Sequence, residues 1–189
     1  MSDELPPDLI RSADEVARRA LALFSVVGLA LGAERKLVLR WLRENELWSD
    51  LSPIELGFID SSSPSRQQVI NAGWWSERLV MLLWALGEVE EIPPSTEQCD
   101  TSEFQDVPPP FADVSVPAFI ARAMLRPDAE LIEMADLVLD LHWAARDAQL
   151  NNRAPRSPVD IEVIQERHHA INWVIGYEGQ PWDEVTSDT

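Results

Sequence analysis

Hydrophobic positions along the chain recur at helical spacing, and serine-based capping signals mark where several of these stretches begin. Ser12 and Glu15 have the spacing of a capping box, in which each side chain accepts a hydrogen bond from the other residue's backbone N–H. This periodicity predicts a helix over 13–31 that ends at Gly32. Its apolar positions are Val16, Ala20, Leu23, Phe24, Val27 and Leu31.

The same pattern predicts shorter helices further along the chain. Ser52 precedes Pro53, with a glutamate three residues after the serine, so a short helix begins there and ends near Asp60. Other helices are expected at 117–125, 128–150 and 157–176. A helix over 33–46 is expected to turn its apolar residues inward, namely Leu37, Val38, Trp41 and Leu42.

One predicted helix differs from the others because part of it is apolar on every side. It begins at the capping box of Ser65 and runs to Leu86, before Gly87. Every residue from Leu79 to Leu86 is apolar, which is typical of a helix buried on all sides. The helix at 66–86 is therefore expected at the centre of the fold.

The predicted elements define a fold class. They indicate an all-α protein, a compact irregular bundle of about six to seven helices in a single domain over 1–189. The central helix is expected to be wrapped by the helices at 13–31, 128–150 and 157–176. The eight tryptophans fall mostly on apolar helix faces, so we expect a tryptophan-rich core.

Three stretches lack a helical pattern. Residues 88–115 form a proline-rich loop, and its part 88–113 holds eight acidic residues, five prolines and no Lys or Arg. A loop of this length is functional or mobile rather than a simple connection. Residues 1–11 are expected to be flexible, and residues 177–189 to fold back on the body as a strap.

The charge of the chain narrows the classes of partner. The sequence has 33 acidic against 15 basic residues, a formal net charge of −18. Nucleic-acid binding and docking on an anionic membrane both need a basic face, so neither is expected. An acidic surface either keeps the protein soluble or contacts a basic protein partner, most plausibly through the loop at 88–113.

The single cysteine and one apolar run indicate in which cellular compartment the protein is expected. Cys99 cannot form an intrachain disulfide and lies among acidic residues, which disfavour a thiolate. The apolar run at 20–31 is too short to span a bilayer and follows an acidic segment, unlike a signal peptide. A reducing cytoplasm is the expected location.

Glu77 precedes the fully apolar stretch by one turn, so its carboxylate is expected to be buried. An ionised buried carboxylate is costly unless paired, and Arg18, Arg19 and Arg167 are the candidate partners. One interpretation is a buried ion pair that fixes the helix register. The other is a carboxyl group with a raised pKa that acts as an acid or base.

Two histidines are expected to point inward from helices that follow one another in the sequence. His168 falls on the apolar stripe of the last helix, and His142 borders that of the preceding one. Such imidazoles can form an acid–base pair or a metal site, or be satisfied core histidines. The candidate polar cluster comprises Glu77, His142, Glu166, Arg167, His168 and Asn172, with His142 and His168 as its possible metal ligands.

Motif spacing gives these candidates little catalytic support. Only Glu166 and His169 have Glu-x-x-His spacing, whereas a di-iron bundle needs two such pairs. The sequence has no phosphate-binding loop, dinucleotide fingerprint, nucleophile elbow or zinc-protease motif. We therefore expect no cofactor and no bound metal.

A series of short motifs follows a fixed order along the chain. They are Ala17-Arg18-Arg19-Ala20-Leu21-Ala22-Leu23, Trp41-Leu42, Leu51-Ser52-Pro53, Trp74-Trp75-Ser76-Glu77, Leu83-Trp84-Ala85-Leu86-Gly87, Leu141-His142-Trp143-Ala144, Glu166-Arg167-His168, Asn172-Trp173 and Trp182-Asp183-Glu184-Val185-Thr186. From about residue 14 to the C-terminus they resemble an uncharacterised bacterial family, domain of unknown function 4272 (DUF4272).

The resemblance implies no established activity, substrate or cofactor. It does imply a set of polar positions that match the family pattern, while His169 departs from it. The matching residues are Arg19, Glu77, His142, Asp147, Glu166, Arg167, His168 and Asn172.

Two functions remain open at this level. The leading hypothesis is a non-catalytic binding or regulatory protein of the bacterial cytoplasm that contacts a basic partner through its acidic surface. The alternative is a small hydrolase that uses Glu77, His142 and His168 in a cleft beneath the loop at 88–113. The hydrolase requires these three side chains to meet at an accessible cavity.

Overall fold

Serine caps start three helices where the sequence predicts them. The computed structural model describes residues 9–153 and 158–187. Ser12, Ser52 and Ser65 each form a complete capping box. The described residues contain no strand and form α1 (Ala13–Ala30), α2 (Arg35–Glu44), η1 (Trp48–Asp50), α3 (Pro53–Asp60), α4 (Arg66–Trp74), α5 (Ser76–Ala85), η2 (Thr101–Glu103), α6 (Val116–Arg122), α7 (Asp128–Leu150), α8 (Ile161–Ile175), η3 (Tyr177–Gly179) and η4 (Trp182–Glu184). The all-α prediction is confirmed.

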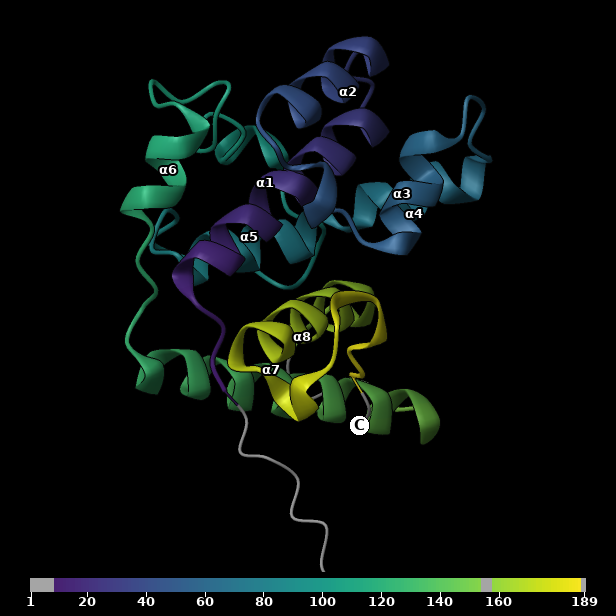
Figure 1. The fold of residues 1–189 in the computed structure, drawn as a ribbon. Helices are drawn as coiled ribbons and strands as arrows, with labels where there is room; N and C mark the ends of the chain where they lie inside the picture. Colours follow the sequence, from purple (N-terminus) through teal and green to yellow (C-terminus); the bar gives the residue numbers. More distant parts are fainter. Residues whose placement is uncertain (1–8, 154–157, 188–189) are drawn as a thin grey trace, which may run out of the picture.

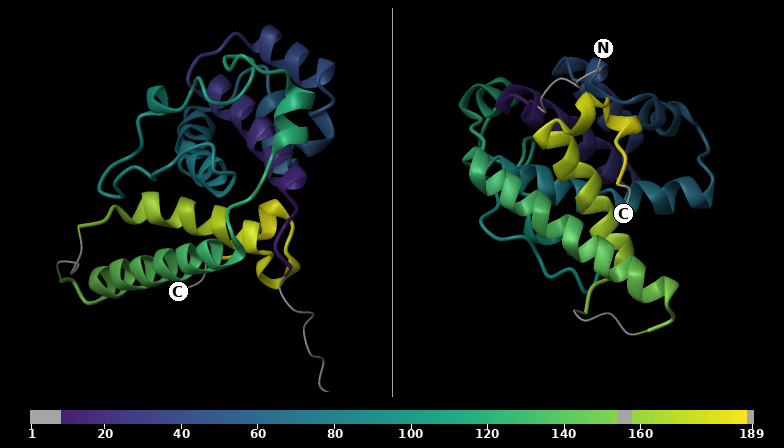
Figure 2. Two further views of the ribbon diagram at one scale, coloured as in Figure 1. Left: turned by 90° about the vertical axis from the view of Figure 1, so that its left-hand side faces the viewer. Right: turned by 90° about the horizontal axis from the view of Figure 1, so that it is seen from below.

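The helices are arranged around α5 and α8. α5 packs against α1 and α8, and α8 packs in turn against α7. In Figures 1 and 2, α7 and α8 lie side by side along one side of the molecule, and the helices from α1 to α6 occupy the other. The expectation that the helix at 128–150 also wraps the central helix is wrong, because α8 lies between α7 and α5.

The central helix is shorter than predicted. Every residue of α5 except Arg78 is buried, as the apolar run indicates. The expectation of one helix over 66–86 is wrong, since the chain turns at Trp75 (φ −67°, ψ −4°) and α4 lies before it. Ala72 is the only buried residue of α4. The turn brings the apolar α5 into the core and leaves the polar α4 at the surface.

The core contains more aliphatic side chains and fewer tryptophans than expected. Trp84, Trp173 and Trp182 are buried, but Trp143 is 57% exposed and the other tryptophans are half-buried. Leu37 is likewise 48% exposed, and of α2 only Leu42 is buried. Helical spacing locates an apolar face, but the packing of neighbouring helices decides whether anything covers it.

Buried contacts hold the acidic loop against the body. Arg167 donates hydrogen bonds to the carbonyl oxygens of Pro93 (2.7 Å) and Pro94 (3.4 Å). The backbone N–H of Asp160 donates to the carbonyl of Ser95 at 2.7 Å. Phe104 is buried in the core, so the loop is anchored at residues 93–95 and near its middle.

The two ends of the described chain meet at the last turn of α8. The backbone N–H of Arg11 donates to the carbonyl of Val174 at 2.9 Å, and the strap folds back so that Trp182 is buried. The rest of the segment 1–11 predicted to be flexible, residues 1–8, lies outside the described residues. Gly176 ends α8 in the left-handed conformation (φ 73°), with the backbone of Leu9 directly against its Cα.

This contact predicts the effect of a side chain at Gly176. In Gly176→Ala, the added Cβ overlaps the backbone oxygen of Leu9, and the left-handed backbone itself costs about 1–2 kcal/mol. We expect a clear loss of unfolding free energy in urea titrations. Gly179→Ala is the matched control, because its φ is 65° but its Cβ meets nothing within 4 Å. Equal losses in both variants would contradict a role for the Leu9 contact.

Candidate functional site

Glu77 forms the buried ion pair that the sequence suggests. Its Oε2 accepts a hydrogen bond from Nε of Arg167 at 2.8 Å and forms an ion pair with Nη2, also at 2.8 Å, and both side chains are almost fully buried. Its Oε1 accepts from the backbone N–H of Cys99 at 2.5 Å. The carboxylate of α5 therefore holds both α8 and the acidic loop.

The two predicted inward histidines do meet. Nδ1 of His142 on α7 lies 3.0 Å from Nδ1 of His168 on α8, and both rings are buried and nearly perpendicular. A hydrogen bond between two Nδ1 atoms needs one donor and one acceptor, so the accepting ring is neutral. Burial, and to a smaller extent the neighbouring His142, lowers the pKa of His168 to about 4. Burial and Arg146 lower the pKa of His142.

These groups form two separate contacts rather than one cluster. Within the described residues, Glu77 has no hydrogen bond to either histidine of the pair. Asn172 donates to the carbonyl oxygen of Thr186 at 3.1 Å and so fastens the strap. Each of these side chains has a partner within the chain, as expected for groups that fix how the helices pack, although Nε2 of His142 is buried without a hydrogen-bond partner.

Glu166 is the member of the predicted cluster that lines a cleft. It pairs with Arg78, whose Nη1 lies 3.1 Å from Nε2 of His169. Burial and the nearby arginine lower the pKa of His169 to about 3, so its neutral ring accepts this hydrogen bond. The cleft, about 480 Å³ in volume, lies among α4, α5 and α8, with Trp74, Trp75 and Glu162 also in its wall.

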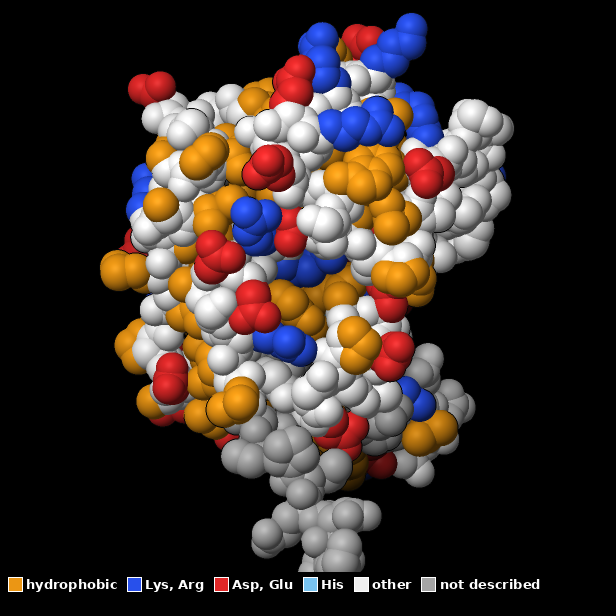
Figure 3. Space-filling model, in the orientation of Figure 1, with side chains coloured by type: hydrophobic (Ala, Val, Ile, Leu, Met, Phe, Trp, Pro, Cys, Tyr) orange, Lys and Arg blue, Asp and Glu red, His pale blue; other side chains and the backbone are white. Residues whose placement is uncertain are grey.

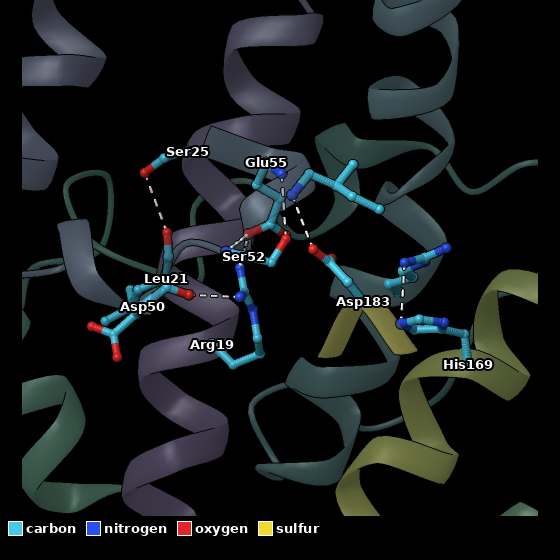
Figure 4. A network of polar contacts seen from close by, with 10 residues as sticks. Arg19, Leu21, Ser25, Asp50, Ser52, Glu55, His169 and Asp183 are labelled. Atoms are coloured by element: carbon cyan, nitrogen blue, oxygen red, sulfur yellow. Dashed lines mark hydrogen bonds and ion pairs between the residues drawn. The ribbon is translucent and has the colours of Figure 1, made fainter. Parts of the chain in front are cut away.

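A second buried ion pair, Arg19 with Glu55, is absent from the predicted cluster. Nη2 of Arg19 donates to Oε2 of Glu55 at 2.5 Å, and Nη1 donates to the carbonyl of Asp50 at 2.6 Å (Figure 4). Glu55 is also the capping glutamate of α3. The capping spacing identifies Glu55 in the sequence, but nothing in the sequence pairs it with Arg19.

The buried Trp182 connects these arginines. The guanidinium of Arg19 lies 4.9 Å from the centre of its ring, and that of Arg78 lies 5.8 Å away. Trp173 and His169 contact the same ring edge to face, at 5.2 and 4.9 Å between ring centres. Cation–π contacts of this kind stabilise the packing of the strap against α1, α5 and α8.

A second cleft, about 370 Å³ in volume, lies where this strap meets α1 and α3. Trp173 and Trp182 line it together with Arg18 and Arg19, and the carboxylates of its wall are Glu15, Asp50, Asp183 and Glu184. The backbone N–H of Ile54 donates to Asp183 at 2.9 Å, which closes one side. The cleft combines apolar rings with charges of both signs.

Neither a reactive thiol nor a metal centre is visible in the described part of the chain. Burial raises the pKa of the Cys99 thiol to about 12, with the Glu77 carboxylate as a second cause. Residues 9–153 and 158–187 contain no group of three or more His, Cys, Asp or Glu side chains placed to hold a metal ion. They also contain no helix long and apolar enough to cross a membrane.

Comparison with protein families gives a match over nearly the whole chain. Residues 3–185 match the profile described as "Domain of unknown function (DUF4272)". The chain belongs to the DUF4272 family. Comparisons with curated proteins and with solved structures gave no match. The DUF4272 description assigns no activity, so functional arguments for this member depend on its own geometry.

The Glu77–Arg167 pair predicts a large and specific effect on stability in this DUF4272 protein. Glu77→Gln leaves a buried guanidinium without its counter-charge, which costs about 3–5 kcal/mol of unfolding free energy. We expect the double variant Glu77→Leu/Arg167→Met to recover most of this loss in urea titrations, because no charge stays buried. Glu162→Gln on the exposed side of α8 is the control. A double variant no more stable than Glu77→Gln would contradict this account.

The buried histidines predict a loss of stability on mild acidification. Their pKa values in the folded protein lie below the ordinary histidine value of 6.5, so between pH 6.5 and about pH 4 the unfolded chain binds more protons than the folded one. Unfolding free energy should therefore fall between about pH 7 and about pH 5, above the range in which most carboxylates titrate. The variant His142→Leu/His168→Leu should lose less unfolding free energy over this pH range, because only His169 still contributes to the loss. The same loss in both proteins would count against the His142–His168 pair as a cause.

Proposed function

We propose that this DUF4272 protein is a non-catalytic binding protein of the bacterial cytoplasm that contacts a basic protein partner through the loop at 88–113. The supporting observation is a row of exposed carboxylates on a firmly held backbone. Seven of the eight acidic side chains of the loop are exposed, and Glu88, the eighth, pairs with Arg122. The seven are Glu90, Glu91, Glu97, Asp100, Glu103, Asp106 and Asp113.

These seven carboxylates have no basic partner within the described residues. They are therefore available to a cationic surface, and their mutual repulsion falls when such a surface binds. The hydrogen bonds from Arg167 and the N–H of Asp160 hold the backbone in place, so little conformational entropy is lost on binding.

The distribution of positive charge also favours the loop as the contact surface for a basic partner. α2 carries Arg35, Lys36, Arg40 and Arg43, and Figure 3 shows Lys and Arg side chains gathered over this helix at the top of the molecule. α2 borders the loop at Pro110 and Phe111, so a basic partner is repelled at this end and attracted to the rest of the loop, which has no Lys or Arg. Such an asymmetry orients an approaching partner as well as attracting it.

The hydrolase alternative has weaker support. It needs Glu77, His142 and His168 at one accessible cavity, but Glu77 is occupied by Arg167 and the histidines bond to each other. A general acid or base has to reach a substrate proton. Buried groups held by partners within the chain are better suited to fixing the fold. The reducing cytoplasm agrees with the single buried cysteine.

The proposal predicts that carboxylates of the loop contribute more to binding a polycation than carboxylates elsewhere. The variant Glu97→Gln/Glu103→Gln/Asp106→Asn should bind a fluorescent oligolysine peptide roughly tenfold more weakly, through loss of three exposed attractions. Fluorescence anisotropy at increasing NaCl measures the affinity, which should fall as salt rises.

The matched control removes three exposed carboxylates far from the loop in sequence. Glu46→Gln/Glu184→Gln/Asp60→Asn has the same net charge as the loop variant and should keep most of the affinity. Equal weakening in the two variants would mean that overall charge, not the loop, attracts the cation, and the proposed contact surface would be wrong.

A further inference from the structure

α7 has an apolar stripe that no part of the described chain covers. The helix packs on α8 through residues that include Ala135, Ala145 and Ala148. On another side, Ile132, Leu139, Trp143 and Leu150 are between 40% and 80% exposed. Seen from below in Figure 2, α7 crosses the front of the molecule with no other segment over its middle.

The stripe has the spacing of a coiled-coil seam. Successive positions of the seam are separated by alternating steps of four and three residues, which is the heptad pattern of helices that pack side by side. Two polar residues interrupt the four apolar ones, Asp136 and Arg146. Both are exposed, and neither belongs to an ion pair within the described residues. In order, the seam reads Ile132, Asp136, Leu139, Trp143, Arg146, Leu150.

This seam is complementary to itself when reversed about residue 141. An antiparallel copy places Ile132 opposite Leu150, Leu139 opposite Trp143, and the carboxylate of Asp136 opposite the guanidinium of Arg146. A twofold axis repeats each of these contacts, as an isologous dimer requires. The six positions cover about 27 Å of helix at 1.5 Å per residue.

We infer that two copies of this chain associate through α7, antiparallel about residue 141, with Asp136 of each copy paired to Arg146 of the other. A second copy is the occupant indicated because each apolar residue meets an apolar one and each unpaired charge meets its opposite. The inference is independent of the proposed contact at 88–113.

The charges beside the seam set the strength of the dimer. Glu133 and Asp140 flank it on one side, and antiparallel packing brings the two Asp140 side chains near each other. Two copies with a formal charge of −18 each also repel. One helix from each copy buries less surface than a standard interface, so we expect a weak dimer that salt strengthens. Binding of a basic partner has the opposite salt dependence.

Sedimentation velocity over micromolar to millimolar concentrations tests the inference. Asp136→Arg and Arg146→Asp should each weaken dimerisation about tenfold or more, because each puts two like-charge contacts into the seam. The double variant Asp136→Arg/Arg146→Asp should restore the affinity, since the pair is reversed but kept. Asp136→Arg also makes the chain less negative. If overall repulsion between the copies decided the affinity, this variant would dimerise more strongly than the wild type.

Two further variants distinguish dimerisation through the seam from nonspecific association of exposed apolar residues. Trp143→Lys should leave the protein monomeric with unchanged circular dichroism, and Leu37→Lys, also an exposed apolar residue but on α2, should dimerise like the wild type. A wild-type protein that stays monomeric at millimolar concentration would overturn the inference. So would single charge variants that dimerise as well as the wild type, or a double variant that recovers nothing.

Discussion

The buried contact between Glu77 and Arg167 is the constraint on which the arrangement of this protein depends. Its carboxylate lies on the central helix and its guanidinium on the last helix, at 2.8 Å. The same two side chains also bind the loop, Glu77 through the N–H of Cys99 and Arg167 through the carbonyls of Pro93 and Pro94. A displaced partner would leave a charge buried without compensation, so the pair specifies one packing of α5, α8 and the loop.

A second set of contacts closes the fold at its C-terminal end. Trp182 lies on a strap that has no long helix of its own, and its ring enters the core. The ring contacts the guanidinium groups of Arg19 and Arg78 and the rings of Trp173 and His169. These contacts join α1, α5 and α8 to the end of the described chain. The clefts of about 370 and 480 Å³ lie where the strap and α8 meet their neighbours. Charged side chains line both clefts, and most of these charges are paired within the described residues.

The two proposed contacts use parts of the surface that this core leaves uncovered. Most polar groups inside the described part of the protein are satisfied by one another, although Nε of Arg19, Oε1 of Glu55 and Nε2 of His142 have no hydrogen-bond partner. The contacts proposed above therefore lie on the surface, at the carboxylates of the loop and the apolar seam of α7. The loop offers charge on a fixed backbone, and the seam offers apolar area with one charge of each sign. The proposed binding of a basic partner would therefore depend on electrostatics, and the proposed dimer on helix packing.

Local patterns in the sequence determined most of the helices, because capping boxes and apolar periodicity act within one or two turns of the chain. They placed α1, α3, α7 and the buried α5, and indicated that Glu77 needs an arginine. Only the tertiary structure decided that Arg167 is that arginine, that Arg19 belongs to Glu55, and that the two histidines bond to each other. It also decided the turn at Trp75 and the exposure of Trp143. Each of these depends on which helices lie side by side, and residues far apart in sequence carry no local signal of their distance in space.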